Sequence, residues 1–305
     1  MRYLLLVFIT AVMFSCTNSP EEKGQTPFYG GVHFTSENAI QPIGIVKDNE
    51  KYELVYSDGQ TWRIAVSDNL MYWSDSTAID IPGSAVGDII LDTNNSLGLE
   101  GTEKTMVIVY NDGEVKMKYS QDRGKSWEDL EPGLPPNSKG NPKLSYNQTD
   151  GNWLMTLTEG PLVSVIQSRD LINWSGTAEI TLESPSEWSE MVYLNGSYLL
   201  VTSDPSISFL FNEAFEQVRS FTNWIRPTKA ATLSVVDTRT LLTTTIGDHL
   251  LTIPMEVTGI EDNALMLNPV TEITQVALSK KRSKLSSLKG QGPSIFEFII
   301  ENEGP

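Results

Sequence analysis

The sequence predicts an all-β protein, a five-bladed β-propeller, on three observations. Short strand-like runs separated by Gly-containing turns recur along the chain. The tryptophans that close three of these units, Trp73, Trp127 and Trp174, follow one another at intervals of 54 and 47 residues. No long amphipathic helical pattern interrupts them. A period of roughly 40–50 residues built from short strands is typical of propeller blades.

The first residues predict a lipoprotein signal peptide over 1–15. Arg2 supplies a positive start, and an apolar run over residues 4–13 leads to Cys16, the single cysteine of the chain. That run is too short for a permanent membrane span, and a small residue before the cysteine resembles a lipoprotein cleavage site. We therefore expect Cys16 to be lipidated and 16–26 to form a flexible tether. An ordinary signal peptide with an incidental cysteine is the alternative.

Two features of the tether favour an outer-membrane protein that faces the cell exterior. The residue after the cysteine is Thr17 and not aspartate, which resembles lipoproteins that are released to the outer membrane. Glu21 and Glu22 resemble the acidic export signals of surface-displayed lipoproteins.

The composition excludes several classes of ligand. The formal net charge of −17 argues against nucleic acid and against docking on anionic lipid, because both need a basic surface. One cysteine allows no internal disulfide, and the two histidines have no metal-ligand spacing around them. No Gly-rich phosphate loop is present. We expect neither a metal nor a cofactor, and a neutral ligand such as a polysaccharide is compatible with the charge.

The repeat predicts blades between residues 27 and 278. Three units, over 52–73, 106–127 and 153–174, each show a strand, a Gly-containing turn, a second strand, and Ser-x-Asp leading to a tryptophan. Asp-Gly between apolar runs is a strong hairpin signal. In the second unit, Ser120, Asp122, Gly124 and Trp127 have the spacing of an Asp-box turn, which we expect to be structural. Two weaker units, 191–202 and 231–246, complete five.

Several segments resemble glycoside hydrolase family 32, the fructan hydrolases and invertases. Residues 32–46 are similar to the family's opening His-Phe-Thr stretch, and 62–73 to its Trp-x-x-Ala-Val-Ser-x-Asp-Leu-x-x-Trp. Residues 251–257 and 267–273 resemble its closing Leu-Pro-Arg-Glu-Leu and Pro-Val-x-Glu-Leu motifs. The resemblance implies a propeller of a retaining hydrolase class, in which two carboxylates about 5–5.5 Å apart act as nucleophile and acid/base.

Carried over residue by residue, the family's catalytic groups are largely replaced. The nucleophilic aspartate falls on Gln41, whose neutral amide cannot form a glycosyl ester. The family's Arg-Asp-Pro falls on 140–142, which places Asn141 at its aspartate. The acid/base glutamate falls on Glu187, with Glu190 as the competing register. The resemblance therefore predicts a pseudoenzyme, in which Glu187 is retained.

A sugar-binding site needs aromatic faces and planar polar groups that grip hydroxyls. The candidates near the old axial pocket or on a nearby loop are Trp62, Trp188, Glu187, Gln41, Asn141, Trp224 and Arg226. For each tryptophan the alternative is a place in the core. If the axial pocket is closed, we expect the ligand along a blade edge. Asp75, Asp88 and Asp92 could hold calcium, although such acids usually face solvent.

The last segment, 279–305, predicts a short C-terminal extension. Residues 279–290 are polar and basic, and 294–300 predict one strand. The family's C-terminal β-sandwich is therefore expected to be absent or reduced to one strand.

Together these features predict a non-catalytic surface lipoprotein that captures fructan, of levan or inulin type, for an outer-membrane glycan import system. Its expected partners are the fructan polysaccharide or oligosaccharide, the outer membrane through the lipid anchor, an outer-membrane glycan transporter complex and a fructan hydrolase. Two alternatives stay open. One is an atypical hydrolase that pairs Glu187 or Glu190 with Asp88 or Glu159. The other is a protein-interaction scaffold within the import complex.

Overall fold

The structure is a computed structural model of the 305-residue chain. It describes residues 41–49, 51–68, 76–101, 104–194, 196–203, 207–222, 231–236, 239–246, 249–258, 266–269, 276–278, 281–290 and 296–302. The predicted lipidation site Cys16, the tether, and the candidate ligand residues Trp224 and Arg226 lie outside these residues. In the described part of the chain, no helix has the length and apolar character needed to cross a membrane.

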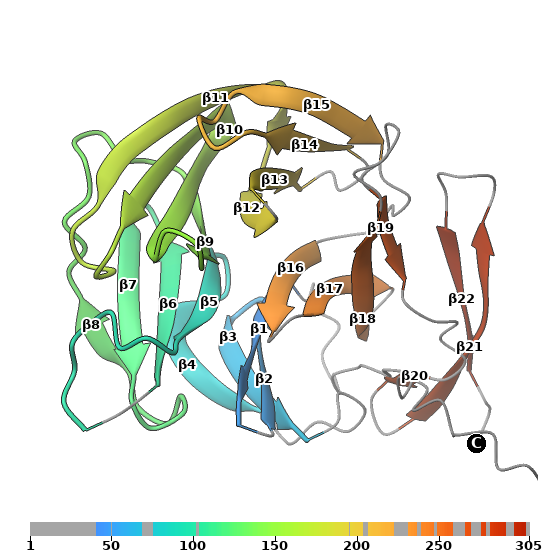
Figure 1. Cartoon of the computed structure of the whole chain (residues 1–305). Helices are drawn as coiled ribbons and strands as arrows, with labels where there is room; N and C mark the ends of the chain where they lie inside the picture. The colour runs from blue at the N-terminus through green and yellow to red at the C-terminus, as the bar shows by residue number, and fades with distance from the viewer. Residues whose placement is uncertain are drawn as a thin grey trace, which may run out of the picture.

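Antiparallel sheets surround a central axis, which confirms the all-β propeller (Figure 1). The first two blades are β1 (Gln41–Asp48), β2 (Lys51–Ser57), β3 (Thr61–Ser67) and β4 (Thr77–Pro82), then β5 (Val86–Asp92), β6 (Thr105–Asn111), β7 (Val115–Ser120) and β8 (Glu128–Leu130). The blades after the third sheet are β12 (Ser189–Leu194), β13 (Ser197–Thr202), β14 (Ile207–Phe211) and β15 (Gln217–Thr222), then β16 (Ala231–Val236), β17 (Arg239–Ile246), β18 (His249–Thr258) and β19 (Met266–Pro269).

The third position is occupied by a three-stranded sheet in the order β11-β10-β9. The described residues therefore form four blades of four strands each, and the prediction of five such blades is wrong. Its strands are β9 (Asn141–Asn147), β10 (Asn152–Ser168) and β11 (Ser175–Ser186). The sequence pattern predicted two strands where the structure has the single 17-residue β10. β10 bends at Gly160, which has a φ of 61°. The Nε atom of Arg169 consequently lies 3.3 Å from Oδ1 of Asn152, at the other end of the strand.

The first strand of each sheet lies at the centre of the ring and the last strand at its periphery (Figure 1). β1 packs against β5 and β16, and β9 packs against β5 and β12. Buried apolar side chains fill the layers between neighbouring sheets; Ile43 and Ile108, for example, share the layer between the first two blades. Because these inner strands are covered on both faces, β1 and β5 are apolar along most of their length.

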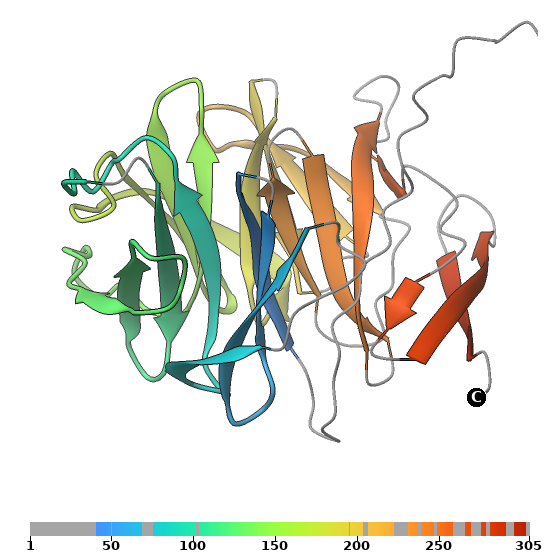
Figure 2. The ribbon, with the colours of Figure 1, turned by 90° about the horizontal axis from the view of Figure 1, so that it is seen from below.

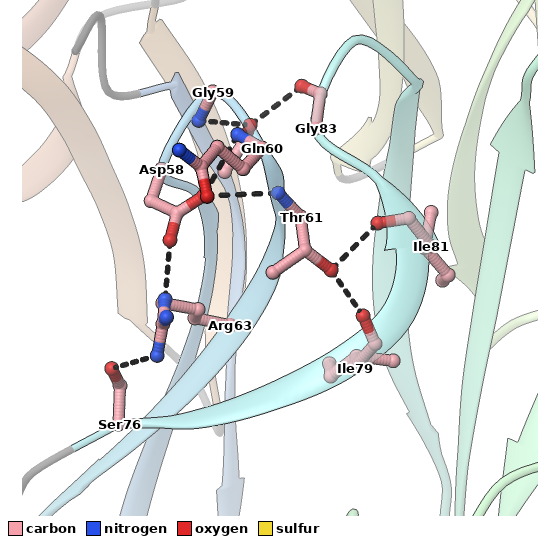
Figure 3. A network of polar contacts seen from close by, with 10 residues as sticks. Asp58, Gly59, Gln60, Thr61, Arg63, Ser76, Ile79, Ile81 and Gly83 are labelled. Carbon is pink, nitrogen blue, oxygen red and sulfur yellow. Dashed lines mark hydrogen bonds and ion pairs between the residues drawn. The ribbon is translucent and has the colours of Figure 1, made fainter.

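The hairpin between β2 and β3 shows how turn chemistry defines a blade (Figure 3). Oδ1 of Asp58 accepts hydrogen bonds from the backbone N–H groups of Gln60 and Thr61, both at 2.9 Å, and Gly59 takes a φ of 88°. The other carboxylate oxygen of Asp58 pairs with Arg63. These contacts confirm the Asp-Gly hairpin that the sequence predicted.

The Asp-box residues of the second blade are structural, as expected. Oδ1 of Asp122 accepts from the N–H groups of Lys125 and Ser126 at 3.1 and 2.9 Å, and Nε1 of Trp127 donates to the carbonyl of Gly124 at 3.1 Å. Hydrogen bonds from the side chain and backbone of Ser126 lower the pKa of Asp122 from 3.8 to about 2. Asp122 is therefore committed to the turn.

A further sheet lies beside the last blade, in the order β20-β21-β22, visible at the right of Figure 2. Its strands are β20 (Val276–Leu278), β21 (Lys281–Gly290) and β22 (Phe296–Asn302). The prediction of one strand in the C-terminal extension is therefore wrong. β22 pairs with the basic segment that forms β21, and this pairing satisfies backbone groups that a lone strand would leave open.

Candidate functional site

A polar pocket of about 590 Å³ opens where the second blade, the third sheet and the entry to β12 meet. It is formed by the β6–β7 turn, the segment before β9, the bend of β10, and the connection from β11 to β12. The lining residues are Asn111, Gly113, Glu114, Val115, Ser138, Lys139, Gly140, Asn141, Thr158, Glu159, Gly160, Ser186 and Glu187. The volume lies within the usual range of small-molecule sites, about 300–1,000 Å³.

Asn141 joins the elements that make the pocket floor. Its Nδ2 donates to the backbone carbonyl of Glu187 at 2.6 Å, and its Oδ1 accepts from Nδ2 of Asn111 at 3.2 Å. The same Asn111 amide donates to the carbonyl of Gly140 at 3.0 Å. Both ends of the Asn141 amide are therefore used. A carboxylate could not make the contact with Glu187, because it has no proton to donate to a carbonyl.

Replacement of Asn141 by aspartate tests this arrangement. We expect Asn141→Asp to lower the free energy of unfolding by about 1–3 kcal/mol, because the carboxylate would face the Glu187 carbonyl without a donor. Thermal or urea unfolding measures the change. Asn95→Asp is the matched control, since Oδ1 of Asn95 only accepts, from Leu99 N–H at 3.0 Å, and aspartate keeps that acceptor. Equal stability of the two variants would contradict the role of Asn141.

Glu187 lies at the rim of the pocket with an exposed side chain, and Glu159 is also exposed at the bend of β10. The backbone N–H of Glu187 is held by Oγ of Ser203 at 2.9 Å. Glu190, the competing register for the acid/base position, is 3% exposed within β12 and does not line the pocket. The structure thus brings Asn141, Glu187 and Glu159 to one pocket.

The remaining sequence candidates lie elsewhere. Gln41 begins β1 and is half-buried, but it does not line the pocket. Trp62 is 0% exposed, and its Nε1 donates to the Ala85 carbonyl at 3.3 Å. Trp188 is 2% exposed. Neighbouring strands bury both indoles, which favours the alternative of a place in the core for each. Their burial is a property of inter-blade packing that no local motif reveals.

A buried polar network that the sequence did not suggest joins the inner strands of the ring. Nζ of Lys143, on β9, donates to the Ile43 carbonyl at 3.0 Å and to Oγ1 of Thr232 at 2.8 Å. Oδ1 of Asp88 lies 3.8 Å from this ammonium, and the Trp188 ring centroid lies 5.5 Å from it. Four inner strands and the entry to β12 thus meet at one side chain. The available sequence signal was a lysine two positions after Asn141.

Asp88 is committed to the fold rather than to chemistry. Its Oδ2 accepts from Leu144 N–H at 2.9 Å and its Oδ1 from Ile89 N–H at 2.8 Å, and the residue is 3% exposed. Burial raises the pKa of this carboxyl, against the opposing effect of Lys143. The alternative in which Asp88 assists a hydrolytic glutamate is therefore wrong, because substrate cannot reach it.

Metal binding finds no support among the described residues. Asp92 is fully buried and accepts from the N–H groups of Asn94 and Leu97 at 3.2 and 3.1 Å. Across the described ranges, no group of three or more His, Cys, Asp or Glu side chains could hold an ion. Asp75 lies outside those ranges.

Curated relatives of the chain are fructan hydrolases. A levanase of Bacillus sp. (strain L7) is 27% identical over 169 residues, which cover 46% of this chain and 18% of the levanase. A levanbiose-producing levanase of Bacillus subtilis (strain 168) is 23% identical over 211 residues, which cover 60% of this chain and 40% of the levanase. The chain thus spans less than half the length of either relative. No family model matches it.

Solved structures agree with the fold. The β-fructofuranosidase from Schwanniomyces occidentalis complexed with fructosyl-erythritol has a TM-score of 0.59 at 16% identity, covering 82% of this chain and 64% of that one. The exo-inulinase from Aspergillus awamori has a TM-score of 0.55 at 14% identity, covering 80% and 68%. At such identities the likeness shows the fold alone. Together, the relatives and the folds confirm the resemblance to the propeller of glycoside hydrolase family 32.

Proposed function

We propose that this protein is a non-catalytic, surface-anchored lipoprotein that binds a levan- or inulin-type fructan. In this proposal Cys16 carries the lipid, the outer membrane holds the protein at the cell exterior, and the bound glycan passes to an outer-membrane transporter complex and a fructan hydrolase. The fructan ligand is supported by relatives that are levanases, at 27% and 23% identity. The polar pocket supplies amides and carboxylates that suit a neutral, hydroxyl-rich ligand.

The observation that carries the non-catalytic assignment is the side chain of Asn141. By resemblance it stands at the aspartate of the family's Arg-Asp-Pro, and both ends of its amide are engaged in hydrogen bonds that join the pocket walls. The nucleophile position is Gln41, which is likewise an amide. Loss of a nucleophile costs on the order of 10⁶ in kcat in a serine protease. An amide at the nucleophile position and the amide of Asn141 in the pocket together support binding rather than hydrolysis.

The rival function is an atypical hydrolase, and one observation favours it: Glu187 and Glu159 both line the pocket with exposed carboxylates. A retaining mechanism needs such a pair about 5–5.5 Å apart, and an inverting one a pair about 6.5–9.5 Å apart.

Isothermal titration with levan, inulin and an unrelated glucan tests the proposed function. We expect binding heat with a fructan and none with the glucan, and no fructose or oligosaccharide released after prolonged incubation of concentrated protein with fructan. Absence of heat with both fructans would remove the ligand assignment. Release of sugar that disappears in Glu187→Gln would instead establish the hydrolase.

A further inference from the structure

We propose that a second glycan-binding surface lies at the end of the third sheet and the fourth blade that is opposite the polar pocket, with Phe215, Tyr193 and Glu213 as its contacts. The surface would hold another part of the same fructan, so the inference rests on the proposed function. The observation that leads to it is the backbone conformation of Phe215.

Phe215 lies in the turn between β14 and β15 with a φ of 59°, in the left-handed region. A bulky side chain is an outlier there, because its Cβ crowds the neighbouring backbone, whereas glycine and asparagine are tolerated. Three of the other non-glycine residues with positive φ in the described chain are asparagines: Asn49, Asn95 and Asn137. The remaining two are Arg123, whose Nε reaches Asp48 at 2.7 Å, and Leu171, which is 0% exposed in the layer between the second and third sheets.

Burial does not explain Phe215 as it explains Leu171. Phe215 is half-buried, and its ring stacks on Tyr198 with centroids 4.7 Å apart and an angle of 10° between the planes. A strained backbone conformation that the surroundings hold in place is found preferentially at functional positions. The strain at Phe215 keeps a partly exposed aromatic ring in a turn that glycine or asparagine would form at lower cost.

Tyr198 also holds a second half-buried ring. Tyr193 packs edge-on against it, with centroids 5.1 Å apart and an angle of 61° between the planes, and donates its hydroxyl to Oε1 of the exposed Glu213 at 3.2 Å. Tyr198 is 4% exposed, and its own hydroxyl accepts from Nδ2 of Asn147 at 2.9 Å. Two partly exposed rings and a carboxylate are therefore in place before a ligand arrives, which lowers the entropic cost of binding.

This surface is separate from the polar pocket. Asn141 begins β9 at the pocket floor, and Asn147 ends the same strand beside Tyr198. The 7 residues of this strand span about 20 Å. The turn that carries Phe215 lies at the same end as Asn147, because Phe211, the last residue of β14, pairs with Tyr198.

The chemistry of the surface fits a neutral sugar. Aromatic rings pack on the C–H surface of sugars, and a carboxylate accepts hydrogen bonds from vicinal hydroxyls. The two turns at this end, 148–151 and 212–216, contain three carboxylates and no lysine or arginine, so an anionic ligand would be repelled. A cationic protein partner is the rival occupant.

Replacement of Phe215 by asparagine removes the ring and keeps the turn, because asparagine tolerates the left-handed backbone. Wild-type protein titrated calorimetrically with short levan oligosaccharides should bind one at the pocket and another at this surface. We expect Phe215→Asn to abolish the second binding event and to weaken the binding of levan polysaccharide about tenfold. Its unfolding temperature should equal or exceed that of the wild type, because relief of strain offsets the lost ring contact.

Replacement of Glu213 by alanine tests the surface at an exposed side chain. We expect Glu213→Ala to weaken the binding of levan as well, because a hydroxyl acceptor is lost. Glu128→Ala is the matched control: Glu128 is also exposed and accepts a tyrosine hydroxyl, that of Tyr119 at 2.5 Å, but it lies on β8 of the second blade. Its affinity for levan should equal that of the wild type.

The outcomes separate the second surface from the proposed function. Wild-type protein that binds one oligosaccharide, with the same affinity in Phe215→Asn and Glu213→Ala, would overturn the second surface and leave the proposed function intact. Wild-type protein that binds no fructan would overturn the proposed function, and the surface with it. Equal weakening by Glu128→Ala would indicate a general charge effect and overturn the surface. Variants that bind levan normally but lose a co-purifying cationic protein would overturn the glycan as its occupant.

Discussion

Replacement of Lys143 by methionine is expected to lower the free energy of unfolding by about 3–5 kcal/mol, the usual cost of leaving one partner of a buried ion pair uncompensated. Asp88 would remain 3% exposed without the ammonium that lies 3.8 Å away. The carbonyl of Ile43 and the hydroxyl of Thr232 would also lose their shared donor. Urea unfolding at neutral pH measures the loss.

Two controls identify the cause of that loss. The double variant Lys143→Met/Asp88→Asn should recover a large part of the stability, because a neutral amide oxygen still accepts from the Ile89 or Leu144 N–H group. The single variant Lys143→Met should also become relatively more stable at acidic pH, where Asp88 can take up a proton. A loss below about 1 kcal/mol, the scale of an exposed pair, would show that Lys143 and Asp88 do not form a buried ion pair.

The second large effect concerns pH and the buried carboxyl of Glu53. The pKa of Glu53 is raised from 4.5 to about 7, mainly by burial and to a smaller extent by the nearby charge of Asp48. The positive charges of Arg123 and Lys51 oppose this rise. Glu53 is 1% exposed on β2, and its Oε2 has no hydrogen-bond partner. Asp48 is itself held by Arg123 at 2.7 Å and by Lys104 at 3.3 Å, which links the first two blades.

The pKa of Glu53 is higher in the folded protein than in the unfolded chain. The protonated form of Glu53 therefore favours the folded state, and this stabilisation is present at low pH. Its contribution is complete below about pH 4.5 and is lost as the pH rises through about 7. We expect Glu53→Gln to remove this dependence and to exceed the wild type in stability at pH 8 by about 2 kcal/mol, a value reduced for partial solvent screening.

Melting curves at pH 5 and pH 8 for wild type, Glu53→Gln and the exposed control Glu131→Gln measure the effect. The control should follow the wild type at both pH values, because Glu131 is exposed in the segment after β8. Parallel pH dependences in wild type and Glu53→Gln would refute the assignment of the proton to Glu53.

The repeat was predictable because its signals are local. Asp58 and Asp122 each bind backbone amides within four residues of themselves, so their turns can be inferred from short motifs. The count of four-stranded blades was not predictable in the same way. Whether residues 152–168 form one strand or two depends on the bend at Gly160, and the pairing of β21 depends on β22 farther along the chain.

The candidate site was predicted in part. The motif alignment led to Asn141 and Glu187, which do share a pocket. Asn141 begins β9, Glu187 stands just before β12, and these two inner strands pack against each other. The alignment also led to Trp62 and Trp188, but both side chains are buried. The motif could not indicate this, because the exposure of a tryptophan depends on the sheet that packs against it.

The sequence by itself determined the all-β class, the turn chemistry of the blades and the amides at positions 41 and 141, since each is a property of residues close together in the chain. Only the tertiary structure decided that Lys143 joins the inner strands in a buried network and that Asn141 and Glu187 line one pocket. Lys143 reaches partners 89 and 100 residues away, and packing between sheets, which brings them together, leaves no local signal.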